Sequence, residues 1–126
     1  MTVMASIHAG PLKHPLEPFS SEGAGAVVCF EGRVRPTENG REIRGLCYEV
    51  YEPMARSMMA SIAEELVRAF DLVVISVEHS NGLVLVGECS FRLLVAGRHR
   101  QESLAAMGEF IDRLKRDVPI WKTAVQ

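Results

Sequence analysis

The sequence lacks an excess of charge of either sign and lacks a long apolar run. Its 14 lysines and arginines stand against 16 aspartates and glutamates, a formal net charge of −2 over 126 residues. Broad nucleic-acid binding needs a basic surface, so we expect no nucleic-acid partner and only a local anion site. No apolar run reaches the roughly 18 residues of a membrane helix, and the N-terminus lacks the features of a secretory signal. We therefore expect a cytoplasmic protein without membrane association.

Cysteine is also scarce, with an odd total of three and no C-x-x-C spacing. Cys29, Cys47 and Cys89 each stand among strand-forming apolar residues, and free cysteine is among the most buried residue types. We predict reduced cysteines in the core and no metal site. Motifs for a nucleophilic serine, zinc, a P-loop or a dinucleotide are absent too, so no cofactor is predicted.

What is present is an ordinary globular composition, with 48% hydrophobic and 24% charged residues. A chain of 126 residues fits one hydrophobic core, so a single domain over 1–126 is predicted. Residues 1–23 combine a short apolar segment at 3–7 with several prolines. Proline is disfavoured in helices and central strands, so this stretch predicts an edge strand and a covering leader.

Periodicity predicts strands, a helix, strands and a second helix along the rest of the chain. A strand over 25–35 leads into a mobile polar loop over 36–42, and a strand over 43–51 is expected to pair back antiparallel. An amphipathic helix of about four turns then follows Pro53. The later predicted elements are a strand over 72–79, a turn at Asn81-Gly82, a strand over 88–96, a helix over 100–116 and an extended piece over 119–122. This order favours an α+β fold with an antiparallel or mixed sheet and two main helices.

The candidate chemistry lies in a set of basic residues near the ends of the predicted elements. Six of the chain's 14 lysines and arginines belong to it, together with one histidine: Arg33, Arg35, Arg98, His99, Arg100, Lys115 and Lys122. An anion site is expected, because arginine offers a bidentate fork and the N–H groups at a helix N-terminus favour negative charge. For the run Arg98-His99-Arg100, the alternative is a solvated loop.

Lys115 occupies an informative position on the last predicted helix. At about 100° per residue it falls about 20° from Leu104 and about 40° from Ile111 around the helix. It thus borders the predicted apolar stripe, which consists of Leu104, Met107, Ile111 and Leu114, with Phe110 at one margin. Lys115 either lines a ligand pocket, or lays its stem on apolar surface while its ammonium reaches water. The histidines outside the basic set are interpreted as structural or without a ligand role: His8, His14 and His79.

Five segments together resemble the large, catalytic subunit of molybdopterin synthase. They are GAVVCFEGRVR at 25–35, YEVYEPMA at 48–55, H-x-x-G-x-x-x-x-G-E at 79–88, the His99-Arg100 pair, and DRLKRDVPIWK at 112–122. Each alone is weak, but all five occur in the same order and with compatible spacing. The resemblance covers roughly residues 25–122 and implies an α/β-hammerhead-like fold.

The resemblance also implies a chemistry and a set of partners. Members of the family form a homodimer within a heterotetramer, and each protomer receives the C-terminal Gly-Gly tail of a ubiquitin-like small subunit carrying a thiocarboxylate. Two sulfur transfers convert cyclic pyranopterin monophosphate into molybdopterin, a sulfurtransferase step of molybdenum cofactor biosynthesis. The substrate phosphate and the tail are both anions, which a local basic cluster matches.

Roles carry over at the matching positions. Lys115 is predicted to donate a proton or orient the acyl group, with Lys122 as a second catalytic lysine. The residues predicted to hold phosphate or stabilise developing charge are Arg35, His99, Arg100 and Lys122. Only four residues follow Lys122, whereas the family ordinarily continues. Two other interpretations therefore stay open: a non-catalytic truncated homologue that dimerises or docks the small subunit, and a pocket for another phosphorylated molecule.

Overall fold

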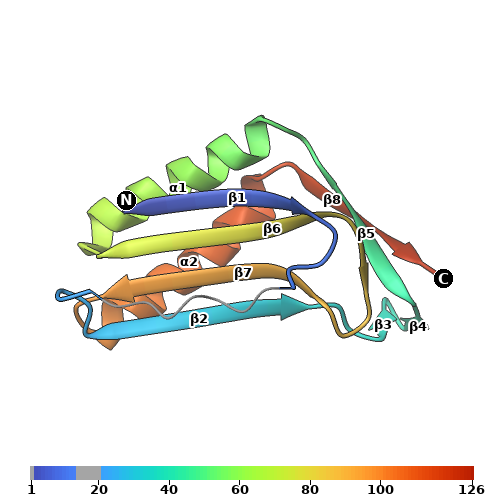
Figure 1. Cartoon of the computed structure of the whole chain (residues 1–126), viewed down its shortest axis with the longest axis horizontal. Coiled ribbons are helices and arrows are strands. Elements are labelled where there is room, and N and C mark those ends of the chain that lie inside the picture. Colours follow the sequence, from blue (N-terminus) through green and yellow to red (C-terminus); the bar gives the residue numbers. More distant parts are fainter. Residues whose placement is uncertain (1, 14–20) are drawn as a thin grey trace.

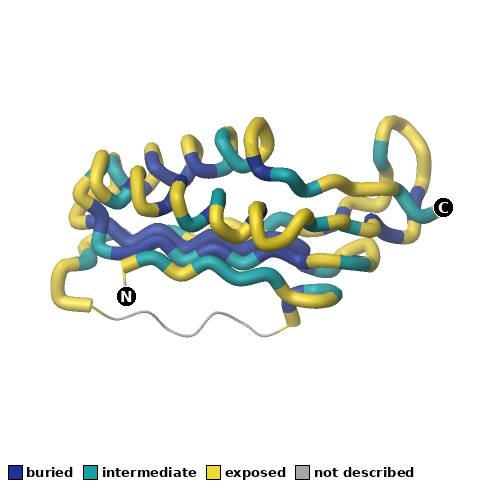
Figure 2. The backbone as a smooth tube through the Cα atoms, turned by 90° about the horizontal axis from the view of Figure 1, so that it is seen from above, coloured by how far each residue is buried: buried dark blue, intermediate teal, exposed yellow. Residues whose placement is uncertain are grey.

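A six-stranded sheet with two helices on one of its faces forms the body of the protein (Figures 1 and 2). The computed structural model describes residues 2–13 and 21–126, so the predictions for His14 and the middle of the leader lie outside the described residues. The main strands are β1 (Val3–Ala9), β2 (Ala26–Arg33), β6 (Val74–Leu85) and β7 (Cys89–Gly97). β7 lies antiparallel between β2 and β6, and β1 runs parallel to β6. The sheet is mixed, and the predicted α+β class and N-terminal edge strand are confirmed.

Both helices pack on the same face of the sheet, as seen edge-on in Figure 2. They are α1 (Met54–Phe70) and α2 (Arg100–Asp117), close to the predicted bounds. Their apolar faces meet β6 and β7 in one core cluster, which includes the fully buried Met59, Leu93 and Phe110. No helix in the described part of the chain is long and apolar enough to cross a membrane.

The buried face of α2 is rotated from the predicted one. Phe110, expected at the margin, is fully buried, whereas Leu104 is 55% exposed. Ser103 accounts for the difference, because its hydroxyl donates to the carbonyl of Ala26 at 3.0 Å and holds this side of the helix against β2. Phe110 lies two turns further along the same face and fills the core with the largest fully buried side chain.

Strand β6 continues through Asn81-Gly82, where the sequence predicted a turn. Its first part pairs with β1 and β7, and from Gly82 onward it pairs with β5 (Gly45–Val50), which in turn pairs with β8 (Ile120–Val125). Gly82 has a φ of +95°, so the strand changes direction there without ending (Figure 1). The turn prediction is therefore wrong. So is the expected pairing of the strand at 43–51 with the strand before it, because β6 and β8 occupy both edges of β5.

The segment predicted to be a mobile loop contains a separate two-stranded hairpin. Its strands are β3 (Thr37–Glu38) and β4 (Arg41–Glu42). Asn39 and Gly40 between them have φ values of +52° and +79°, the left-handed conformations that a two-residue type I′ turn requires. Val34 and Ile43 flank the hairpin and pack in a small core cluster with Leu46 and Val84.

Only one of the three free cysteines is buried as predicted, and this is Cys89. Cys29 is exposed on β2, which is an edge strand of the sheet among the described residues. Cys47 is exposed on β5 and pairs with Leu83, which is itself 47% exposed. The strand-forming residues around the cysteines therefore correctly predicted that the cysteines lie in strands, but they did not indicate which face of each strand is buried.

Candidate functional site

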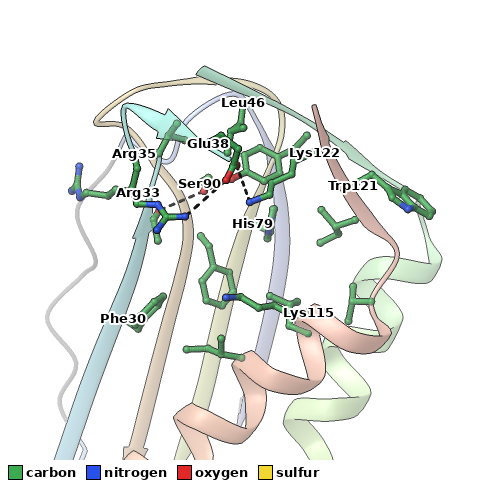
Figure 3. A pocket seen from close by; sticks show the side chains of 18 of the residues that line it. Phe30, Arg33, Arg35, Glu38, Leu46, His79, Ser90, Lys115, Trp121 and Lys122 are labelled. Carbon is green, nitrogen blue, oxygen red and sulfur yellow. Dashed lines mark hydrogen bonds and ion pairs between the residues drawn. The ribbon is translucent and has the colours of Figure 1, made fainter. Parts of the chain in front are cut away.

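A pocket of about 450 Å³ opens between the end of α2, strand β8 and the β3–β4 hairpin (Figure 3). We call its exposed cationic side chains the rim; these are Arg33, Arg35, Lys115 and Lys122. We call its uncharged aromatic lining the floor; this comprises Phe30, Tyr48, His79 and Phe91, of which Phe30 is 40% exposed and the other three are buried or half-buried. Such a division suits a ligand in which an anionic group is joined to a less polar ring.

Lys115 comes from the last turn of α2 and lines the pocket next to Ile111 and Leu114. Both neighbours are half-buried, and Figure 3 shows the lysine side chain extending from the helix across the pocket. The position of Lys115 at the border of the apolar stripe therefore places it in the pocket wall. Its chemical role there stays a prediction.

Lys122 enters the rim from β8, directly opposite Tyr48 in the register with β5. Its Nζ lies 3.1 Å from the Oε2 of Glu38, whose side chain is only 17% exposed. The other carboxylate oxygen lies 3.9 Å from a guanidinium nitrogen of Arg35. Glu38 thus offsets part of the positive charge of the rim, and an incoming anion competes with it. The sequence did not single out Glu38, because its pairing requires the hairpin and β8 to meet in space.

His79 is a second pocket residue that the sequence did not assign to the site. The residue is 6% exposed, and its ring lies edge-on to Tyr48 with the centroids 5.1 Å apart. Its Nδ1 donates to the carbonyl of Ser80 at 2.8 Å, since a carbonyl oxygen only accepts. Burial lowers the pKa of the imidazole, and the hydrogen bond to Ser80 opposes part of that effect. The sequence signal that could have indicated a role for His79 in the site is its position at the start of the H-x-x-G segment.

The basic run Arg98, His99 and Arg100 lies at the opposite end of α2 and does not line the pocket. Arg100 and Lys115 are 15 positions apart on the helix, which at about 1.5 Å per residue separates them by about 22 Å. The Nδ1 of His99 lies 3.4 Å from a carboxylate oxygen of Glu102. Within one chain, the prediction of a single pocket that includes His99 and Arg100 is therefore wrong, because the helix holds the two basic groups apart.

The chemistry available in the pocket is anion binding and proton donation. Two lysines and two arginines reach the rim, and the ammonium groups of Lys115 and Lys122 can each donate hydrogen bonds or a proton. Residues 2–13 and 21–126 contain no cluster of three or more His, Cys, Asp or Glu side chains placed to hold a metal ion.

Fold and pocket together define a class of α+β protein: a mixed sheet covered on one face by two helices, with a pocket at one end whose rim carries four cationic side chains. Comparison with known proteins narrows this class. A family model described as MoaE protein matches residues 7–117. The chain belongs to the MoaE family.

Individual relatives agree with this assignment. The molybdopterin synthase catalytic subunit of Pyrococcus abyssi is 36% identical over 106 residues, which cover 84% of this chain and 72% of the relative. That of Culex quinquefasciatus is 42% identical over 107 residues, covering 84% and 68%. These similarities confirm the resemblance inferred from the five segments.

Solved structures agree as well. Molybdopterin synthase from Staphylococcus aureus superimposes with a TM-score of 0.79 at 33% identity, over 84% of this chain and 77% of that one. A complex of subunits 1 and 2 of molybdopterin-converting factor from Helicobacter pylori superimposes with a TM-score of 0.77 at 25% identity, over 98% and 84%. The predicted fold class is therefore that of the family.

Proposed function

We propose that this chain is the catalytic subunit of a cytoplasmic molybdopterin synthase, a sulfurtransferase that acts on cyclic pyranopterin monophosphate. The observation that carries the proposal is the presence of Lys115 and Lys122 in one pocket of a chain that belongs to the MoaE family. A phosphate needs cationic donors, and the rim supplies four of them. The ring system of the substrate needs a less polar surface, which the floor supplies.

The sulfur donor in this proposal is the thiocarboxylate at the C-terminus of a ubiquitin-like small subunit. In each transfer the sulfur forms a bond to a carbon of the substrate, whose bond to oxygen breaks. The carbon–sulfur bond of the tail is hydrolysed, so that an oxygen from water replaces the sulfur and the tail is left as a carboxylate. Lys115 donates a proton or orients the acyl group, and Lys122 and Arg35 stabilise negative charge on the tail or on the phosphate. The Helicobacter pylori complex, which contains two subunits of a molybdopterin-converting factor, supports a small-subunit partner.

A homodimer within a heterotetramer completes the proposal. His99 and Arg100 lie at the far end of α2, about 22 Å from Lys115 by the rise of the helix. A small substrate cannot span that distance within one chain. If these residues hold the same phosphate, they come from a second copy of the chain, and equilibrium sedimentation would then show a dimer of this subunit.

The test is reconstitution with a thiocarboxylated small subunit and cyclic pyranopterin monophosphate. We expect molybdopterin to form, and Lys115→Ala to lower turnover by about 100-fold or more, the usual effect of removing a general acid. Arg116→Ala is the matched control, because Arg116 pairs with Asp117 and does not line the pocket. Small-subunit binding without any product would favour the non-catalytic homologue, and undiminished turnover in Lys115→Ala would refute the lysine assignment.

A further inference from the structure

The imidazole of His79 is held at the floor of the pocket in one orientation. Tyr48 lies edge-on to it, and the ring of Phe91 lies 5.8 Å from it between centroids. Its Nδ1 is committed to the carbonyl of Ser80 at 2.8 Å. This hydrogen bond fixes the proton on Nδ1, so the neutral ring presents the lone pair of Nε2 as an acceptor.

The Nε2 of His79 is open to the pocket. Among residues 2–13 and 21–126 it has no hydrogen-bond partner, and the one fully buried side-chain nitrogen or oxygen without a partner is the Oγ of Ser80. Nε2 is therefore not sealed in the protein interior, and His79 lines the pocket. The nitrogen is available to a ligand.

The hydroxyl groups beside His79 are already engaged. Ser90 donates its proton to the carbonyl of Gly32 at 3.4 Å, and the hydroxyl of Tyr48 lies 3.0 Å from the Oγ of Ser90. With the Ser90 proton directed to Gly32, Tyr48 donates to Ser90. The hydroxyl donors beside His79 thus donate to other groups of the protein, whereas the Nε2 of His79 is an acceptor without a partner in the described residues.

Charge separates the floor from the rim. Burial lowers the pKa of His79, so the imidazole is uncharged at neutral pH and differs from the four cations above it. An anion is drawn to the rim, whereas a neutral acceptor in an aromatic surrounding pairs with an N–H group. Phe30 and Phe91, with ring centroids 6.0 Å apart, add flat apolar surface beside it.

We propose that His79 is a specificity-determining residue whose Nε2 accepts a hydrogen bond from an N–H group of the substrate's heterocycle. The proposal rests on the proposed function and assigns the uncharged part of the substrate to the floor. A pterin carries several ring and amino N–H groups, and an N–H left unpaired in a desolvated pocket weakens binding. Analogues that lack the matching N–H are disfavoured for the same reason.

The experiment uses the chain in complex with the carboxylate form of its small subunit, which binds without turnover. Cyclic pyranopterin monophosphate and, separately, inorganic phosphate are titrated calorimetrically into the wild type, His79→Phe and His79→Gln. Phenylalanine keeps a ring against Tyr48 but removes the acceptor, whereas glutamine keeps an acceptor. We expect His79→Phe to weaken substrate binding by roughly 10- to 100-fold, with the affinity for phosphate unchanged and a smaller loss in His79→Gln.

The outcomes separate the two proposals. Wild-type substrate affinity in His79→Phe would overturn the assignment of His79, and so would a parallel loss of phosphate affinity, which indicates general damage to the pocket. If His79→Phe does not fold, His79→Gln is compared with a further acceptor-free variant, His79→Leu. The role of His79 is then supported only if both variants lose affinity for the substrate but not for phosphate, and His79→Leu loses more. His8→Phe is the matched control, because His8 is an exposed histidine that does not line the pocket, and this variant should bind like the wild type. A wild-type complex that fails to bind the pterin would instead count against the proposed function.

Discussion

At the scale of single residues, Glu38 sets how much positive charge the rim presents. Its carboxylate contacts Lys122 and lies near Arg35, so two of the four cations at the rim share this anionic partner, while Arg33 pairs with Glu31. The phosphate or the tail of a partner must displace this carboxylate to reach Lys122. Glu38 therefore lowers the affinity for every anion alike, and so favours ligands that gain further contacts on the floor.

Replacing Glu38 by glutamine should raise anion affinity. The variant removes the competing charge but keeps a side chain of the same size, and we expect inorganic phosphate to bind roughly 3- to 10-fold more tightly. Calorimetric titration at two salt concentrations measures this change. Glu42→Gln on the same hairpin is the control, because Glu42 lies outside the pocket lining. An equal gain in both variants would mean that only the net charge matters.

At the scale of elements, the close approach of β7 to α2 depends on one glycine. A Cβ atom added at Gly97 would lie 2.5 Å from the Oγ of Ser103 and 3.1 Å from a methyl carbon of Leu72. The hydroxyl of Ser103 is the group that donates to the carbonyl of Ala26 and fixes the rotation of α2. The rotation of the helix that carries Lys115 is thus set at its first turn.

Gly97→Ala should destabilise the protein, because the added methyl group forces Ser103 or the helix to move. We expect the free energy of unfolding to fall by about 1–3 kcal/mol. Gly108→Ala is the matched change on α2, where an added Cβ meets nothing within 4 Å, and it should raise that free energy by about 0.5–1 kcal/mol. Urea unfolding measures both, and a stabilised Gly97→Ala would contradict this account of the contact.

The elements that the sequence predicted well are those with a strong local period. Both helices and the edge strand at the N-terminus fall where apolar spacing and proline placed them. The turn at Asn81-Gly82 failed because a glycine inside a bent strand has the same local signature as a turn. Its role in redirecting β6 depends on which strands lie beside it, and a single sequence does not contain that information.

The site was predicted in part. Lys115 and Lys122 do share a pocket, as family resemblance implied, whereas His99 and Arg100 lie elsewhere in the chain. The rise per residue of a helix separates Arg100 from Lys115, so this error could have been avoided from the sequence. Glu38 was beyond sequence reasoning, because it reaches the pocket only through the fold of the hairpin.

At the scale of the whole molecule, buried and paired titratable groups make stability depend on pH. Burial lowers the pKa of His79 from 6.5. Hydrogen bonds from Arg33 and then Arg92 lower the pKa of Glu31 from 4.5, although partial burial opposes them. Arg92 is itself buried at 5% exposure and also pairs with Glu78. The pKa values of His79 and Glu31 are therefore lower in the folded chain than in the unfolded one, so the unfolded chain takes up each proton at a higher pH.

Acid should therefore weaken the fold in two stages. The free energy of unfolding falls first as the pH drops below 6.5, where unfolded His79 is protonated, and again below 4.5, where unfolded Glu31 is protonated. Arg116 lowers the pKa of Asp117, so that residue adds to the second stage. Thermal unfolding across this pH range measures both stages. The first decrease in the free energy of unfolding should be smaller in His79→Phe, and the second should be partly smaller in Glu31→Gln. If the first decrease is unchanged in His79→Phe, groups other than His79 cause it.

The β3–β4 hairpin has a consequence for how this pocket diverges during evolution. Within the described residues it pairs with no strand of the larger sheet, yet it supplies Glu38 to the pocket wall. Mutations and changes of length in the hairpin leave the main hydrogen-bond ladders intact, whereas changes on the floor disturb the sheet itself. Natural selection can thus alter the ligand preference of the rim with little cost to folding, and the hairpin is where sequences of related enzymes are expected to vary most.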